Sequence, residues 1–137
     1  MKVKSSTKTH KAKKRSKNLT VASLKKKADA IFSIYIRLRD KKCITCGSTE
    51  NLQCGHFQSR KHNATRYDPY NCQAQCVRCN MFNWGEQYEF GKQLDKKYGD
   101  GIAESLKKKA QEIHKFTTYE LQDIIDTYKK EVEELGG

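Results

Sequence analysis

Two short stretches decide the fold: Cys43-Ile44-Thr45-Cys46-Gly47 and, after a spacer of 29 residues between Cys46 and Cys76, Gln75-Cys76-Val77-Arg78-Cys79-Asn80. In each stretch two residues separate two cysteines, so one tight turn can present both sulfurs to the same metal ion with little strain. Four thiolates at tetrahedral angles suit Zn²⁺. The predicted ligands of one structural zinc ion are Cys43, Cys46, Cys76 and Cys79. A site closed by four cysteines has no open coordination position, so any chemistry must come from other residues.

The cysteine content favours a reducing compartment. The N-terminus is basic and lacks the apolar run of a secretory signal, so the six cysteines do not indicate a disulfide framework. A redox dithiol usually accompanies a βαβ pattern, which this sequence lacks. Cys54 and Cys72 are interpreted as small buried residues, with a role as alternative zinc ligands left open. No stretch is long enough to span a bilayer, so we expect a cytoplasmic protein without a membrane partner.

The charge is unevenly distributed. The formal net charge of the 137 residues is +12, and residues 1–20 contain eight Lys/Arg and no Asp/Glu, so +8 lies there and +4 on the rest. We expect a disordered basic arm over 1–18 and one zinc-containing domain over 19–137. A basic arm suits a polyanion such as nucleic acid, although a solubilising or localisation tail has the same composition. The arm residues chosen as DNA contacts are Lys11, Lys13, Lys14 and Arg15.

Hydrophobic periodicity predicts helices on both sides of the cysteines. A helix over about 20–40 carries one apolar face, formed by Leu24, Ala28, Ile31, Tyr35 and Leu38. A strand is expected over 52–57, a polar loop over 58–70, and a helix beginning near Asn80. Three helical segments follow, marked by Tyr88 to Tyr98, by Ile102 to Ile113, and by a capping box at Thr117-x-x-Glu120. The apolar stripe of the last helix, from Leu121 to Leu135, can pack into the core or form a homodimer contact.

A histidine and two asparagines lie between and beside the cysteine pairs. His56 ends the predicted strand, where a neutral imidazole can take a proton from water. Asn71 can orient the imidazole or its loop. Asn80 offers an oxygen to Mg²⁺, which prefers oxygen ligands. Arg60 and Arg66 can grip phosphates bidentately. On residue types alone each also has a structural interpretation, because lone histidines often belong to the fold and asparagines often cap helices.

The order of these motifs resembles a known family. A strand ending in histidine, a loop, and a helix bearing an asparagine are similar to the ββα-metal, or His-Me finger, motif of HNH nucleases. The combination is also similar to the phage NinG/Rap recombination endonucleases, on the following motifs: Arg37-x-Arg39-Asp40, Cys43-x-x-Cys46-Gly47, Gly55-His56-Phe57, Arg66-Tyr67, Asn71 and Gln75-Cys76-x-x-Cys79-Asn80. This resemblance implies an α+β fold with a treble-clef-like ββα-metal core over 41–90, packed by C-terminal helices over 86–135.

The resemblance also implies a function. It implies metal-dependent cleavage of branched DNA, such as Holliday junctions and D-loops, in the host cytoplasm during phage recombination, with recombination proteins as further partners. His56 takes the place of the general base, Asn80 that of the residue binding catalytic Mg²⁺ or Mn²⁺, and Asn71 that of the middle asparagine. Many HNH enzymes have an acidic ligand before the base, where this chain has Gly55. Two residues are candidates to replace that ligand: Asp68, otherwise a turn residue, and His62, otherwise a solvated side chain.

Two further alternatives bear on function. The aromatic residues after the second cysteine pair, Trp84, Tyr88 and Phe90, can pack onto the zinc unit or stack on unpaired bases. The chief rival to an endonuclease is a non-catalytic zinc module that binds nucleic acid. That rival explains the cysteines and the charge but gives His56 and Asn80 no joint purpose. A protein-interaction adaptor with the same zinc core is a third possibility.

Overall fold

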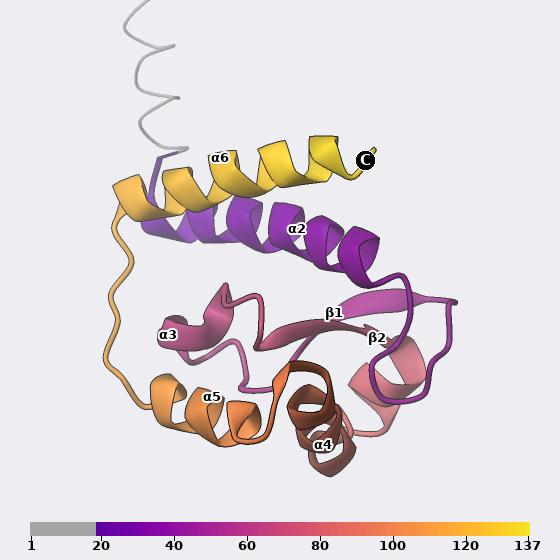
Figure 1. Cartoon of the computed structure of the whole chain (residues 1–137). Helices are drawn as coiled ribbons and strands as arrows, with labels where there is room; N and C mark the ends of the chain where they lie inside the picture. Colours follow the sequence, from indigo (N-terminus) through magenta and orange to yellow (C-terminus); the bar gives the residue numbers. More distant parts are fainter. Residues whose placement is uncertain (1–18) are drawn as a thin grey trace, which may run out of the picture.

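The computed structural model describes residues 19–137, which form the predicted mixed α+β fold (Figure 1). The elements in chain order are α2 (Val21–Asp40), β1 (Leu52–His56), α3 (Asn63–Arg66), β2 (Cys72–Cys76), the π-helical turn η1 (Arg78–Phe82), α4 (Gln87–Tyr98), α5 (Ile102–Ala110) and α6 (Thr118–Glu134). The predictions for the basic arm, its disorder and its contacts through Lys11, Lys13, Lys14 and Arg15 lie outside the described residues.

Helix α2 is the central element of the fold. Its N-terminus is capped by the Thr20 side chain, which accepts a hydrogen bond from the backbone N–H of Ser23. The side chains that it buries recur at every fourth residue: Leu24, Ala28, Phe32 and Ile36. The predicted apolar face is confirmed at Leu24 and Ala28. Its other members, Ile31, Tyr35 and Leu38, are only half-buried. None of the helices in residues 19–137 is both long and apolar enough to cross a membrane.

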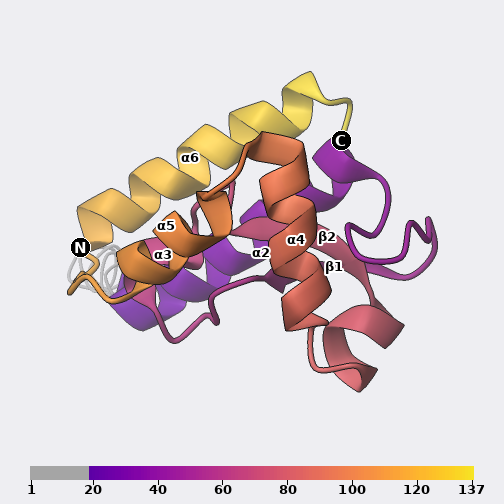
Figure 2. The same cartoon turned by 60° about the horizontal axis from the view of Figure 1, so that its bottom comes forward.

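The elements stack in layers on either side of α2 and the sheet (Figures 1 and 2). Leu24 and Ala28 pack against Leu121 of α6, which fixes α6 along the outer side of α2. Further along α2, Phe32 packs on Ala74 of the sheet. A separate cluster joins α4 to α5 through Phe90, Leu94 and Leu106. The apolar stripe of α6 is therefore covered by α2 of the same chain. A homodimer stays a prediction, but this stripe is not available as its contact surface.

The sheet has two antiparallel strands, and its register fixes the positions of the motifs. Leu52 pairs with Cys76 at one end and His56 pairs with Cys72 at the other. Gly55 lies opposite Gln73, and a side chain on Gly55 would collide with that of Gln75. A larger residue before His56, such as the acidic ligand of many HNH enzymes, would therefore require the Gln75 side chain to move.

Three predicted boundaries need correction. The loop predicted over 58–70 contains the short helix α3, and the helix expected to begin near Asn80 is the five-residue turn η1, which begins at Arg78. Helix α5 ends at Ala110, so Ile113 is 96% exposed rather than part of a buried face. The reason is topological, because the chain after α5 runs past α3 to reach α6 (Figure 1), and Asn63 of α3 donates a hydrogen bond to the carbonyl of His114.

Candidate functional site

Four cysteines meet beside one end of the hairpin. Cys43 and Cys46 lie in the turn after α2, Cys76 ends β2, and Cys79 lies in η1. Their four sulfurs all lie within 4.8 Å of one another, and the Sγ atoms of Cys46 and Cys76 are 3.6 Å apart. The predicted ligand set is therefore assembled, and it could hold a zinc ion.

The electrostatics of this cluster fit a divalent cation. Burial raises the pKa of Cys43, but hydrogen bonds from the Thr45 side chain and from backbone amides outweigh it and lower that pKa to about 6. Burial and the neighbouring thiols raise the pKa of Cys79 to about 12. The backbone thus stabilises a first thiolate, while further negative charge is disfavoured without a cation. Zn²⁺ supplies that cation and takes thiolates as ligands.

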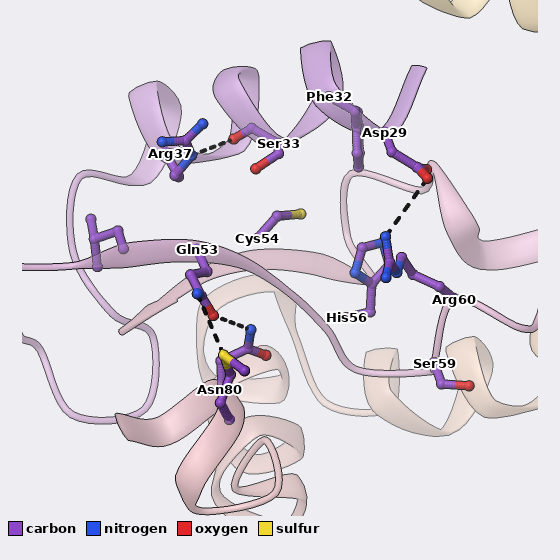
Figure 3. A pocket seen from close by; sticks show the side chains of 12 residues that line it. Asp29, Phe32, Ser33, Arg37, Gln53, Cys54, His56, Ser59, Arg60 and Asn80 are labelled. Atoms are coloured by element: carbon purple, nitrogen blue, oxygen red, sulfur yellow. Dashed lines mark hydrogen bonds and ion pairs between the residues drawn. The ribbon is translucent and has the colours of Figure 1, made fainter. Parts of the chain in front are cut away.

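A pocket of about 630 Å³ lies along β1, between α2 and η1 (Figure 3). Helix α2 contributes charged and polar side chains to it, β1 contributes His56, and η1 contributes Asn80. The lining residues are Asp29, Phe32, Ser33, Arg37, Leu52, Gln53, Cys54, His56, Ser59, Arg60, Asn80 and Met81. The hairpin and the turn after it therefore bring the two principal predicted site residues, His56 and Asn80, to one cavity.

His56 is held as a neutral imidazole of defined orientation. Its Nε2 lies 3.1 Å from the backbone oxygen of Arg66. A carbonyl oxygen can only accept a hydrogen bond, so Nε2 carries the proton and Nδ1 keeps the free lone pair. Burial lowers the pKa of His56 to about 4, and the positive charges of Arg60 and Arg66 act in the same direction, against the Arg66 carbonyl and Asp29. At neutral pH the side chain is therefore a proton acceptor.

Asn80 has its amide fixed by β1. Its Nδ2 donates to Oε1 of Gln53 at 2.8 Å, and the amide of Gln53 in turn lies 3.6 Å from the sulfur of Met81. With the nitrogen so engaged, Oδ1 is the atom of Asn80 that can meet a hard cation.

Asn71 does not line the pocket but holds the loop beside it. Its side chain is fully buried, and Oδ1 accepts from the backbone N–H of Gln58 at 2.8 Å. Its Nδ2 donates to the carbonyls of Gln58 at 3.0 Å and Thr65 at 3.1 Å. Thr65 precedes the residue whose carbonyl orients His56. Of the two roles considered for Asn71, the geometry favours positioning the loop.

Asp29 is a pocket residue that the sequence did not predict. Arg66 holds it through two hydrogen bonds, Nε to Oδ1 at 3.0 Å and Nη2 to Oδ2 at 2.5 Å, and the Tyr67 hydroxyl donates to Oδ1 at 2.9 Å. The signal available was that Asp29 is the only carboxylate of α2 before its last residue, and it lies beside buried Ala28.

The two arginines predicted to grip phosphates differ in geometry. The Arg66 side chain is only 13% exposed, and its guanidinium is engaged by Asp29 and by the carbonyl of Arg60. The Arg60 side chain is 61% exposed on the pocket rim and lies 3.7 Å from Asp29. Arg66 is thus better placed to position Asp29, while the exposed Arg60, which forms a longer ion pair with Asp29, is the arginine that can turn toward a ligand. Arg37, also exposed on the rim, was not predicted as a contact.

The secondary candidates lie away from the pocket. Asp68 accepts from the backbone N–H of Tyr70 and pairs with Lys109, so it serves the turn. His62 precedes α3 and does not line the pocket. Phe90 is buried, whereas Trp84 is 89% and Tyr88 80% exposed. The prediction that these rings pack onto the zinc unit is therefore wrong for Trp84 and Tyr88. Phe90 is buried, but in the cluster that joins α4 to α5 and not in the cysteine cluster.

Comparison with known proteins identifies the family. A family model described as bacteriophage Lambda NinG protein matches residues 1–136. The chain belongs to the NinG family. Protein ninG of Salmonella phage P22 is 27% identical over 115 residues, covering 80% of this chain and 56% of that protein. Protein ninG of Escherichia phage 933W is 26% identical over the same length, covering 57% of that protein. The chain thus spans little more than half the length of these relatives. No solved structure matches it significantly.

Proposed function

We propose that this NinG-family chain is a metal-dependent endonuclease that hydrolyses phosphodiester bonds in branched DNA. The observation that carries the proposal is the convergence of His56 and Asn80 on one pocket, with the free lone pair of the imidazole on Nδ1. In this proposal β1, β2 and η1 form a ββα-metal core, and the four-cysteine zinc fixes the end of the hairpin opposite His56.

His56 is the proposed general base. Its Nδ1 would take a proton from the attacking water, and the Arg66 carbonyl would steady the imidazolium that forms through Nε2. The low pKa of His56 in the free protein leaves the imidazole fully unprotonated at pH 7, but it also makes the imidazole a weak base. A bound phosphodiester brings negative charge beside the ring, which raises the pKa of the imidazole toward the working pH. Substrate would thus strengthen the base that it needs.

A hard cation fits the donor set of the pocket. Asn80 offers Oδ1, and no carboxylate precedes His56, so a Mg²⁺ or Mn²⁺ ion would be held there mainly by water and substrate phosphate. When bound, such an ion offsets charge on the phosphate and on the leaving 3′ oxygen. Asp29 lies in the same pocket, but its oxygens already accept from Arg66 and Tyr67.

The rim of the pocket would hold DNA. Arg60 and Arg37 are exposed cations able to contact backbone phosphates on either side of His56. Beyond η1, the exposed rings of Trp84 and Tyr88 offer faces on which unpaired bases could stack. Branched DNA has such bases where strands exchange, and the resemblance to recombination endonucleases favours Holliday junctions and D-loops as substrates. A homodimer and recombination proteins stay predicted partners, and the host cytoplasm the predicted location.

A cleavage assay separates this proposal from its rivals. The full chain is incubated with a labelled four-way junction and with a linear duplex of the same sequence, in Mg²⁺ or in EDTA. Cleavage that needs Mg²⁺ and prefers the junction supports the endonuclease. Binding without cleavage would instead identify a nucleic-acid-binding zinc module, and the absence of both would favour a protein-interaction adaptor.

A further inference from the structure

A second group of metal-ligating side chains lies at the His56 end of the hairpin. Among residues 19–137, two groups of His, Cys, Asp or Glu could hold a metal ion: the four cysteines, and the trio of Cys54, His56 and Cys72. The ligand atoms of the trio all lie within 4.8 Å of one another. The strand register produces this meeting, because His56 pairs with Cys72 and Cys54 precedes His56 by two residues on the same face of β1.

We propose that Cys54, His56 and Cys72 form a second binding site for a thiophilic metal ion such as Zn²⁺, and that this ion competes with the use of His56 as a base. Two thiolates and an imidazole select soft or borderline ions over Mg²⁺. Three protein ligands leave one position of a tetrahedral ion open, unlike the closed four-cysteine site. Binding would release both thiol protons to solvent, and two thiolates would balance the charge of the ion.

The surroundings of the trio fit this use. Cys54 and His56 line the pocket, which gives an ion access from solvent (Figure 3). Asn71 Nδ2 lies 3.9 Å from the sulfur of Cys72, an outer contact that fixes this ligand. Cys72 itself is fully buried, so its sulfur is held in place by the core under α2.

The consequence for chemistry follows from the imidazole. A neutral imidazole has one nitrogen with a free lone pair, and an ion that binds it leaves none for a proton. Mg²⁺ at Asn80 would leave His56 available, whereas Zn²⁺ on the trio would remove it. This regulatory part rests on the proposed function, while the binding of the ion does not.

Metal content tests the site without any DNA. The full chain is equilibrated across a series of zinc buffers, and bound zinc is counted by native mass spectrometry. We expect a second equivalent of zinc beyond that of the four cysteines. Cys54→Ala and Cys72→Ala should each weaken the second equivalent by about tenfold or more and keep the first. Ser33→Ala, which changes another residue of the pocket lining, should keep both.

Two results would overturn the site: one equivalent of zinc at every buffered concentration, or a second equivalent that survives both cysteine variants. A disulfide between Cys54 and Cys72, seen as a mass lower by two hydrogen atoms with no second zinc, would also overturn it. If Cys72→Ala fails to fold, Cys54→Ala and the Co²⁺ spectrum of the native chain decide. With a second site occupied, the total thiolate-to-cobalt absorption should exceed the absorption that the four cysteines give alone.

Cleavage then tests the regulatory part. At constant Mg²⁺, added zinc should lower the cleavage rate of the native chain about tenfold or more. In Cys54→Ala the rates with and without zinc should be nearly equal. An equal fall in both would contradict competition at this site. A chain that binds the second zinc but never cuts with Mg²⁺ would refute the proposed nuclease and leave the metal site standing.

Discussion

The two ends of the β1–β2 hairpin carry similar side chains in different surroundings. At the Leu52–Cys76 end, four cysteines close on one another and leave no position for a substrate. At the His56–Cys72 end, His56 and Cys54 line a pocket, Cys72 is buried behind them, and the imidazole keeps a free lone pair on Nδ1. A zinc ion at the four cysteines could therefore fix one end of the hairpin and leave the other end open, because none of its ligands is the proposed base His56.

The largest effect should come from breaking the closed end. In Cys76→Ser the zinc ion loses a ligand, and a structural zinc contributes on the order of 10 kcal/mol to the folding of small domains, which is comparable to their whole stability. We expect the variant to lose its zinc and its cooperative thermal transition by circular dichroism. The matched control, Cys54→Ala at the open end, should keep the zinc of the four cysteines and the cooperative transition. A folded, zinc-free Cys76→Ser chain would mean that the helices suffice without the metal.

A smaller loss of stability is expected from the loop that supports the open end. Asn71→Ala removes three hydrogen bonds and leaves buried backbone groups of the loop unpaired, so the free energy of unfolding should fall by about 4 kcal/mol. Asn63→Ala, which removes one exposed hydrogen bond to His114, should cost less than about 1 kcal/mol. Urea unfolding measures both values. Equal losses would contradict a positioning role for Asn71.

The closed end was predictable from the sequence and the open end only in part. Cysteine spacing reports directly on the zinc ligands, because both members of a pair lie in one local turn. His56 and Asn80 were found through motif order. Asp29 and Arg37 were missed, because they reach the pocket only after α2 packs over the hairpin, a long-range arrangement that local periodicity does not encode. Trp84 was expected to pack onto the zinc unit, because a hydrophobic side chain is usually buried. Whether another element covers it depends on the tertiary fold, which hydrophobicity alone does not report.

The next smaller effect is the pH dependence of stability that His56 contributes at the open end. The pKa of His56 falls from 6.5 to about 4 on folding, chiefly through burial, with Arg60 and Arg66 lowering it and Asp29 opposing them. Between those values the unfolded chain binds more protons than the folded one. The contribution of His56 is therefore complete above pH 6.5 and is lost as the pH falls toward 4, by at most about 3 kcal/mol.

Thermal unfolding across that window, without added metal, measures this contribution. His56→Gln should flatten the slope between pH 6.5 and pH 4 relative to the native chain. His62→Gln, which changes a histidine outside the pocket, should keep the slope. An unchanged slope in His56→Gln would show that the imidazole is not desolvated as the structure has it.

The smallest effect should arise on the rim. Trp84→Ala removes an exposed ring beyond η1, and we expect affinity for a four-way junction to fall on the order of tenfold, with little change for a linear duplex. Tyr119→Ala, which removes an equally exposed ring on α6, should change neither. Fluorescence anisotropy with both DNAs measures the ratio. An equal loss on both DNAs would refute base stacking by Trp84.

The central claim is that the open end performs hydrolysis while the closed end only supports it. Single-turnover cleavage of a four-way junction by the native chain and by His56→Ala tests it most directly, with His62→Ala as the matched control. We expect His56→Ala to lower the cleavage rate by about 100-fold or more while the zinc of the four cysteines and junction binding stay unchanged. Cleavage by His56→Ala at the native rate, with both of those retained, would contradict the account.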